Sequence, residues 1–214
     1  VTAGVHMSDA GLRAHDLVIG YETPLTEPLN FEVGPGEILV VVGESGCGKS
    51  TLLSTLAGVT AALKGEIYSG DRCLNGVPIH KRNIGLVFQD PLLFPHLSLL
   101  DNIGYSLRAS GQSRDVARAR SQELLDWVGL ENIVNQKTWE LSGGQAGRIA
   151  LARAIAAKPA VLLLDEPYSA LDSPTRMRLL ADVKDLVSLE KIPTIHVTHD
   201  HGEAQLLATA TLTW

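Results

Sequence analysis

The sequence predicts an α/β fold built on a mostly parallel β-sheet. Three short runs are typical of buried parallel strands, and the first of them is apolar throughout, as expected for a strand that is covered on both faces. These runs are ILVVVG at 38–43, AVLLLDEP at 160–167 and PTIHVTHD at 193–200. Segments with helical periodicity separate them, and strands that alternate with helices favour a parallel, twisted sheet. Ligands in such sheets bind beyond the carboxyl ends of the strands.

The first ninety residues contain further strand signals and one helix. KGEIYSGDRCL at 64–74 indicates a pair of edge strands, and three segments have the composition of single strands: LVIGY at 17–21, LNFEV at 29–33 and NIGLVFQD at 83–90. The last of them is predicted to end at Gln89. GKSTLLSTLAG, residues 48–58, is predicted as a helix that Gly58 caps at its C-terminus.

The character of the chain changes from Pro91 to about Trp139, where charged segments with helical spacing predominate. We interpret this region as a helical insertion in the α/β core, with helices in SLLDNIGYSLRA (98–109) and RDVARARSQELLDWVGL (114–130). Ser98 followed by Asp101 resembles a capping box with the shorter acid. A later amphipathic helix, residues 173–190, is expected to have Ser173 as its cap and Pro174 in its first turn.

Composition limits the classes of function. The chain has 214 residues, 45% of them apolar, which indicates one domain or a core with one subdomain rather than a disordered protein. Its net charge of −6 argues against broad nucleic-acid binding. Cys47 and Cys73 are expected to be free thiols. No apolar run reaches the length of a membrane-spanning helix, and residues 1–7 are expected to be a tag remnant or a disordered N-terminus.

The strongest motif is GESGCGKST, residues 43–51, which follows an apolar strand and opens a helix. It matches the phosphate-binding P-loop in the context that this motif requires. We expect Gly43, Gly46 and Gly48 to adopt backbone torsions that side chains forbid, so that successive N–H groups point at phosphate oxygens. Lys49 is expected to reach the β- and γ-phosphates. The predicted nucleotide contacts of this loop are Gly43, Glu44, Ser45, Gly46, Cys47, Gly48, Lys49, Ser50 and Thr51.

Polar residues at the ends of three other strands complete a nucleotide site. Asp165 is expected to hold Mg²⁺, together with the hydroxyl of Ser50 and the amide of Gln89. Glu166 is expected to face the γ-phosphate and to orient or activate the attacking water. His199 follows the strand at 193–198, and its imidazole can donate a hydrogen bond to a γ-phosphate oxygen.

A second glycine-rich turn, LSGGQ at residues 141–145, precedes the helical pattern IALARAIAA. Ser142 is a good N-cap, and Gly143 and Gly144 expose backbone N–H groups at a helix start. The turn lacks a lysine, so it is poorly equipped to hold a nucleotide alone. It is either an ordinary helix cap or a cradle for a γ-phosphate that is bound elsewhere.

The order of these motifs resembles the nucleotide-binding subunit of ABC transporters, over about residues 17–207. The resemblance implies a P-loop NTPase core with an N-terminal antiparallel β subdomain at 8–90 and 158–214, and an inserted helical subdomain at 91–157. In that family two subunits pair head to tail, so that Ser142, Gly143, Gly144 and Gln145 of one copy close on the ATP of the other. The resemblance also implies that Tyr21 stacks on adenine, that Lys49, Gln89, Glu166 and His199 are catalytic, and that Asp172 in SALD signals between the two sites.

The resemblance further implies ATP and Mg²⁺ as cofactors and a homodimer or a heterodimer with a related subunit. The expected partners are an integral membrane permease and an extracytoplasmic substrate-binding protein, with no nucleic acid. The leading hypothesis is an ATPase that powers import of a small solute from the cytoplasmic face of a bacterial or archaeal membrane. One alternative is a soluble ABC-type ATPase that acts on nucleic acid or ribosomes, and another is a switch with negligible hydrolysis, against which Glu166 argues.

Two features depart from the family pattern. Gly147 lies inside the helix after LSGGQ and is expected to cost about 1 kcal/mol against alanine. Glu44 replaces a common proline and adds negative charge near the phosphates. No regulatory domain is expected within this chain.

Overall fold

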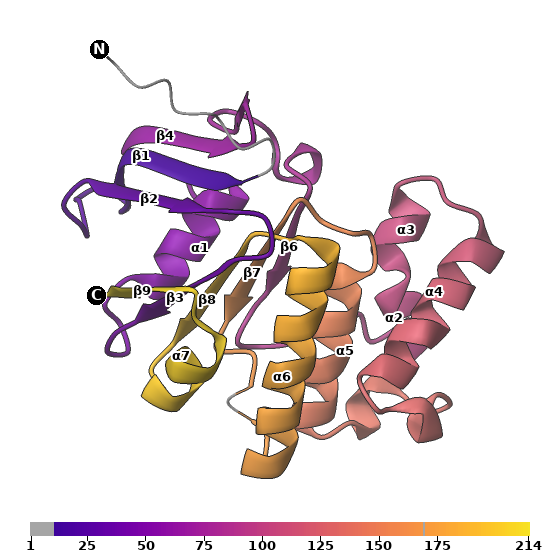
Figure 1. The fold of residues 1–214 in the computed structure, drawn as a ribbon. Coiled ribbons are helices and arrows are strands. Elements are labelled where there is room, and N and C mark those ends of the chain that lie inside the picture. Colours follow the sequence, from indigo (N-terminus) through magenta and orange to yellow (C-terminus); the bar gives the residue numbers. More distant parts are fainter. Residues whose placement is uncertain (1–10, 169) are drawn as a thin grey trace.

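The computed structural model describes residues 11–168 and 170–214 (Figure 1). The prediction for residues 1–7 therefore lies outside the described residues. Among the described residues, no helix is both long and apolar enough to cross a bilayer.

A five-stranded parallel sheet forms the centre of the fold, in the order β6-β7-β8-β3-β9. Its strands are β3 (Ile38–Val42), β6 (Ile84–Val87), β7 (Val161–Asp165), β8 (Thr194–Thr198) and β9 (Ala210–Thr213). Every residue of β3, β7 and β8 is buried, as expected for strands covered on both faces. The three apolar runs of the sequence are thus neighbouring strands of one sheet.

Each face of the parallel sheet has its own hydrophobic core. Leu39 and Val41 of β3 pack with helix α1 (Lys49–Ala57) and with the antiparallel sheet, whereas Val40 and Val42 pack with helices on the other side. Figure 1 shows α1 between the two sheets, with α5 (Gly143–Ile155), α6 (Ser173–Glu190) and α7 (His201–Leu207) covering the opposite face. Gly58 caps α1 in a left-handed conformation, with φ 84°, as the sequence predicts.

The antiparallel sheet has the order β2-β1-β4-β5. It consists of β1 (Leu12–Val18), β2 (Leu29–Val33), β4 (Lys64–Ser69) and β5 (Arg72–Cys73). The predicted strand at 17–21 is wrong in its bounds, because β1 begins at Leu12 and ends at Val18. A register break between Ala14 and Leu17 interrupts the alternation of buried and exposed residues, and this hides the start of the strand in the sequence.

The charged middle of the chain is helical. It contains α2 (Leu99–Ile103), α3 (Tyr105–Ala109), α4 (Arg114–Trp127) and α5, and three 3-10 turns occur at Ile79–Lys81, Glu131–Ile133 and Thr138–Glu140. The predicted helix at 98–109 is split at Gly104, where an added Cβ would lie 2.7 Å from Ser121 Oγ. Buried residues of α2, α4 and α5 belong to the same core as those of β3 and β7. The subdomain boundary at 91–157 remains a prediction.

Two predicted element ends need correction. Asp172, not Ser173, is the N-cap of α6, because its extended backbone precedes the helix and its carboxylate accepts the N–H of Thr175 at 3.0 Å. Pro174 lies in the first turn as expected. Strand β6 ends at Val87, two residues before Gln89. The predicted capping of α2 is confirmed in part: Ser98 Oγ accepts the N–H of Asp101, but the Asp101 carboxylate accepts the Ser98 hydroxyl at 2.6 Å rather than its backbone N–H.

Candidate functional site

The P-loop connects β3 to α1, and its glycines serve two purposes. Gly46 and Gly48 have φ of 85° and 110°, conformations that strongly favour glycine. Gly43 does not share this feature, so the expectation that it needs a special torsion is wrong. An added Cβ at Gly43 would lie 2.9 Å from Cβ of Trp214 and 3.1 Å from Sγ of Cys47, so crowding excludes a side chain there. Both cysteines are free thiols.

Lys49 is the first residue of α1, and its side chain is held by the loop itself. Its Nζ donates to the carbonyl oxygens of Gly43 and Glu44, both at 2.8 Å, and the residue is only 6% exposed. A helix N-terminus carries about half a positive charge from its unpaired N–H groups. The ammonium group therefore adds a full positive charge at a place that already favours anions.

Asp165 is the last residue of β7 and lies beside the P-loop. Burial raises the pKa of its carboxyl, and the neighbouring Glu166 raises it further. A hydrogen bond from the Ser50 hydroxyl and the charge of Lys49 lower this pKa, but the net shift is upward. A buried carboxylate in contact with a hydroxyl is an oxygen donor set of the kind that suits Mg²⁺. No group of three or more His, Cys, Asp or Glu that could hold a metal occurs among residues 11–168 and 170–214.

Glu166 and His199 meet although they follow different strands. His199 Nδ1 lies 2.9 Å from Oε2 of Glu166, whose side chain is 13% exposed against 59% for the imidazole. Glu166 has φ of 43°, a left-handed conformation that is uncommon for residues with a side chain. Its N–H donates to the carbonyl oxygen of Val197 at 3.1 Å, which ties the strained residue to β8.

One cleft of about 330 Å³ brings most of the predicted residues together. It is lined by Tyr21, Leu25, Ser45, Gly46, Gly48, Lys49, Ser50, Thr51, Gln89 and Glu166. Tyr21 is 69% exposed, so a face of its ring is open to a ligand. Leu25 is the one lining residue that the sequence analysis missed, and an exposed leucine in a loop has no pattern that would have identified it. Four predicted residues lie in the P-loop or beside it but do not line this cleft, namely Gly43, Glu44, Cys47 and Asp165.

The LSGGQ turn starts α5 and lies outside that cleft. Ser142 Oγ accepts the N–H of Gln145, whose side-chain oxygen accepts the N–H of Ser142 at 2.9 Å, forming a capping box. An added Cβ at Gly144 would lie 2.6 Å from Leu171 Cδ2, so this glycine is required by close packing. None of the residues 142–145 lines the P-loop cleft of the same chain.

Asp172 and His199 also lie outside the residues that line the cleft. The N–H of Thr175, which the Asp172 carboxylate accepts, is the main cause of a lowered pKa at Asp172. The fully exposed carboxylate therefore stays ionised and caps α6, and it is available to other contacts on its outer side.

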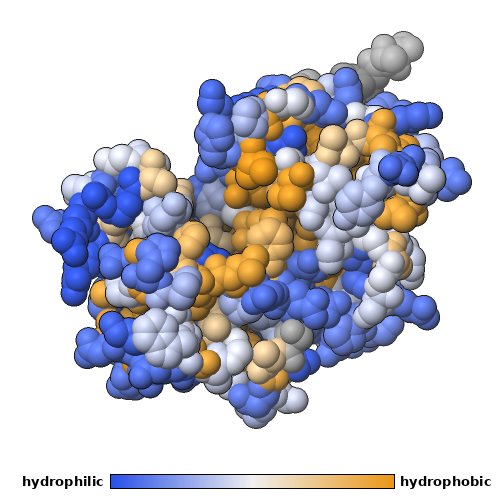
Figure 2. All heavy atoms as spheres, turned by 180° about the vertical axis from the view of Figure 1, so that it is seen from behind, coloured by the Kyte–Doolittle hydropathy of each residue, from blue (hydrophilic) through white to orange (hydrophobic). Residues whose placement is uncertain are grey.

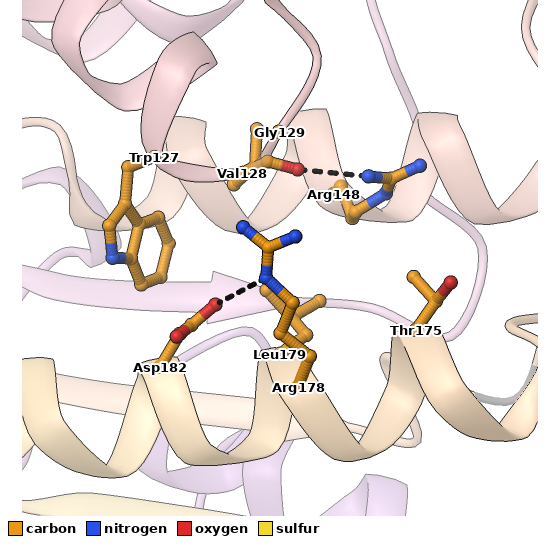
Figure 3. Close-up of a pocket in the computed structure, with 8 residues that line it drawn as sticks. All are labelled: Trp127, Val128, Gly129, Arg148, Thr175, Arg178, Leu179 and Asp182. Atoms are coloured by element: carbon orange, nitrogen blue, oxygen red, sulfur yellow. Dashed lines mark hydrogen bonds and ion pairs between the residues drawn. The ribbon is translucent and has the colours of Figure 1, made fainter.

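A second, smaller cleft of about 120 Å³ lies where the end of α4, α5 and α6 meet (Figure 3). Arg148 Nη1 donates to the carbonyl oxygen of Val128 at 2.9 Å, and Arg178 Nε lies 3.8 Å from Asp182. Burial lowers the pKa of Arg148, although Asp172 opposes this effect. The two clefts share no lining residue, so this one is distinct from the P-loop cleft.

A strand, a P-loop and a helix, with an acidic pair at the end of β7, which β8 separates from β3 in the sheet, define a P-loop nucleotide-binding protein. Comparison with known proteins narrows the class. The profile of the ABC transporter family matches residues 26–169, and the chain belongs to that family.

Relatives with assigned roles match most of the chain. The sn-glycerol-3-phosphate import ATP-binding protein UgpC of Ralstonia nicotianae is 41% identical over 180 residues, which are 84% of this chain and 49% of the relative. The trehalose/maltose import ATP-binding protein MalK of Thermococcus litoralis is 40% identical over 92% of this chain and 55% of its own length. The chain thus spans about half the length of these relatives.

Solved structures share the fold. The ATP-binding cassette MJ0796, in a dimeric post-hydrolysis state bound to ADP and Pi, superimposes with a TM-score of 0.87 at 29% identity, covering 94% of this chain and 93% of the cassette. A second dimeric structure of the same cassette gives a TM-score of 0.86. The predicted fold class, a P-loop core with parallel and antiparallel sheets and helical elements, is confirmed.

Proposed function

We propose that this chain binds and hydrolyses ATP as the nucleotide-binding subunit of an importer of the ABC transporter family. The observation that carries the proposal is the single cleft in which the P-loop residues Lys49 and Ser50 meet Gln89 and Glu166. The relatives named for import of sn-glycerol-3-phosphate and of trehalose/maltose support transport as the purpose of hydrolysis. The same names favour import over a soluble ATPase that acts on nucleic acid or ribosomes.

The P-loop cleft suits a nucleoside triphosphate along its whole length. Tyr21 is the proposed stacking surface for adenine, since aromatic faces bind bases without needing particular polar groups. The backbone of Gly43–Thr51 is the proposed cradle of the phosphates. Lys49 would exchange its two carbonyl partners for phosphate oxygens, a stronger charge-assisted interaction.

Ser50, Asp165 and Gln89 are the proposed magnesium ligands, and two of them, Ser50 and Gln89, line the cleft. When bound, the cation neutralises charge on the phosphates and favours displacement at the γ-phosphorus. Its positive charge would also offset the burial that raises the pKa of Asp165, so that the carboxylate is ionised where it is needed.

Glu166 is the proposed group that orients and deprotonates the attacking water, yielding ADP and inorganic phosphate from ATP. His199 directs Nδ1 at Glu166, which leaves Nε2 as the ring nitrogen that can meet a γ-phosphate oxygen. Lys49, Gln89, Glu166 and His199 together form the proposed catalytic set.

A second copy of the subunit is proposed to supply the other half of each site. The N-terminus of α5 presents Gly143 and Gly144 beside a Ser142–Gln145 capping box, which is suited to an anion, yet it lies outside its own chain's cleft. Head-to-tail pairing would bring this turn, and Asp172, to the γ-phosphate held by the partner's P-loop. Both solved structures of the similar cassette are dimeric, which supports this arrangement.

The proposed location is the cytoplasmic face of a bacterial or archaeal membrane, next to a permease that receives solute from an extracytoplasmic binding protein. Seen from behind, the surface has a hollow in which apolar side chains gather (Figure 2). Phe88, Leu92 and Tyr105 are large apolar residues that are 37%, 55% and 48% exposed. Exposed apolar side chains are typical of protein interfaces, and these three residues support docking on a membrane partner near residues 88–105.

Substitution of Glu166 tests the enzymatic half of the proposal. Glu166→Gln keeps the shape of the side chain and an acceptor for His199, but removes the base, so phosphate release should fall about 10²–10⁴-fold while ATP binding persists. Glu123→Gln, at an exposed position on α4, is the matched control and should keep wild-type turnover. Equal hydrolysis by Glu166→Gln and wild type would refute the assigned role.

Co-purification tests the transport half. The chain should be recovered from detergent-solubilised membranes together with a polytopic membrane protein. Recovery with ribosomes or nucleic acid instead would support the soluble alternative.

A further inference from the structure

His199 lies between two residues that are firmly anchored. On one side, Thr198 ends β8 and is 1% exposed. On the other, the N–H of Asp200 donates to Thr198 Oγ1 at 3.0 Å, and Asp200 Oδ1 caps α7 by accepting the N–H of Gly202 at 2.7 Å. The imidazole itself is mostly exposed. Its direction is therefore set by the backbone on either side rather than by burial of the ring.

A buried carboxylate fixes the start of α7 against β8. Glu203, 6% exposed, lies 2.9 Å from Nε2 of His196, which is fully buried within β8. Burial acts to raise the pKa of Glu203, but the hydrogen bond and charge of His196 and a hydrogen bond from Thr198 lower it, and the net shift is downward. The carboxylate is thus ionised in place, and it attaches α7 to the strand that carries His199.

Arg176 on α6 connects this cluster to a second loop. Its Nη1 lies 3.3 Å from Asp200 Oδ2 and 3.9 Å from Glu203 Oε1. Its Nη2 donates to the carbonyl oxygen of Leu171 at 3.1 Å. One guanidinium therefore contacts the N-cap residue of α7, a residue in the first turn of that helix and the loop that contains Asp172. Its planar fork allows this in a way that a lysine ammonium does not.

We propose that Arg176 is a positioning residue that holds His199 against Glu166 and couples its placement to the loop at 171–172. The proposal rests on the proposed ATPase function for its kinetic consequence. Arg176 lines a separate surface hollow and is absent from the P-loop cleft, so it acts through Asp200 and not by touching nucleotide. A displacement of residues 171–172 would move the guanidinium of Arg176, which contacts Asp200. Movement of Asp200 would in turn shift the imidazole of the neighbouring His199.

The coupling explains why the Glu166–His199 contact needs support. Glu166 holds a left-handed conformation, with φ of 43°, that is unfavourable for a residue with a side chain. Its partner is a ring that is 59% exposed, so the contact depends on where the backbone around Thr198 and Asp200 places the side chain of His199. A misplacement of about 1 Å at such a group is enough to reduce a rate on the order of a hundredfold.

The test compares Arg176→Met and Arg176→Lys with Arg178→Met. Arg178 is the matched control, because it lies two residues further along α6, on a different face, and pairs with Asp182 (Figure 3). Arg176→Met should lower kcat on the order of ten- to a hundredfold with KM for ATP changed by less than about twofold. Arg176→Lys should restore part of kcat, and Arg178→Met should leave both constants at the wild-type values.

A double-mutant cycle with His199→Ala separates positioning from general damage. If Arg176 acts through His199, Arg176→Met should reduce kcat by less than about twofold in the His199→Ala background. An undiminished effect in that background would overturn the proposal, as would a rise in KM with kcat unchanged.

A measurement that does not depend on ATP turnover tests the positioning role of Arg176 separately from the proposed ATPase function. The NMR signal of the His199 ring, assigned with His199→Ala, should move in Arg176→Met toward its position in Glu166→Ala, and should stay in place in Arg178→Met. An unmoved signal in folded Arg176→Met, or in Arg176→Lys if the methionine variant does not fold, refutes the positioning role. A wild-type chain without ATPase activity would contradict the proposed function, while the NMR result would still decide whether Arg176 holds His199.

Discussion

Gly144→Ala is the perturbation whose size the structure determines most clearly. An added Cβ would lie 2.6 Å from Leu171 Cδ2 and 3.2 Å from the carbonyl oxygen of Ala170. Leu171 is 9% exposed and belongs to the main core, so it has little room to turn aside. Overpacking of this kind lowers the free energy of unfolding by about 1–3 kcal/mol, whereas the higher helix propensity of alanine raises it by about 0.5–1 kcal/mol. We expect the free energy of unfolding to fall by about 1–2 kcal/mol.

Thermal unfolding without nucleotide measures this effect. For a chain of this size the melting temperature should fall by about 2–8 °C, at about 2–4 °C for each kcal/mol. Gly143→Ala is the control, because its nearest contact is Ala170 Cβ at 3.3 Å, and it should shift the melting temperature much less. Shortening Leu171 to valine should recover part of the loss in Gly144→Ala. A Gly144→Ala protein that melts at or above the wild-type temperature would show that close packing does not require this glycine.

Two further predictions concern the nucleotide cleft. Asp165→Asn should raise stability in the absence of nucleotide while weakening MgATP binding. Because the folded-state pKa of Asp165 is raised, its stabilising contribution is complete below the unfolded-state pKa and is lost as pH rises through the folded-state value. The asparagine variant should therefore melt above wild type near neutral pH, and the difference should shrink as the pH is lowered; a lower melting temperature at neutral pH would contradict this. Tyr21→Ala should weaken ATP binding by about 1–3 kcal/mol, measured by calorimetry, while Tyr21→Trp should bind nearly as wild type does. An unchanged affinity for ATP in Tyr21→Ala would contradict the proposed stacking of Tyr21 on adenine.

Much of the fold follows from local sequence. Residues 38–42, 161–165 and 194–198 form strands where the sequence predicts them. The first two are strongly apolar, as expected for strands buried on both faces, whereas the third also buries Thr194, His196 and Thr198. Caps are also local, since the partners lie three residues apart, and Ser98 and Ser142 act as predicted. The P-loop motif was identifiable for the same reason, as its function depends on the spacing of adjacent residues.

Features that depend on distant contacts were not predictable. Gly43 is crowded by Trp214, which is 171 residues away in the chain. Gly147 looked like a weak point in α5, yet an added Cβ would lie 3.2 Å from the carbonyl oxygen of Pro167, so alanine there would gain less than its helix propensity suggests. The attachment of Arg176 to Asp200 likewise joins two helices whose proximity no periodicity reveals.

The central claim is that the terminal phosphate of ATP is held between two copies of the chain. Sedimentation of Glu166→Gln with and without MgATP tests it most directly. We predict a MgATP-dependent species with twice the mass of the chain, which Ser142→Arg should abolish because it places bulk and positive charge at the start of α5. A protein that binds MgATP yet remains a single chain at every protein concentration tested would contradict the claim.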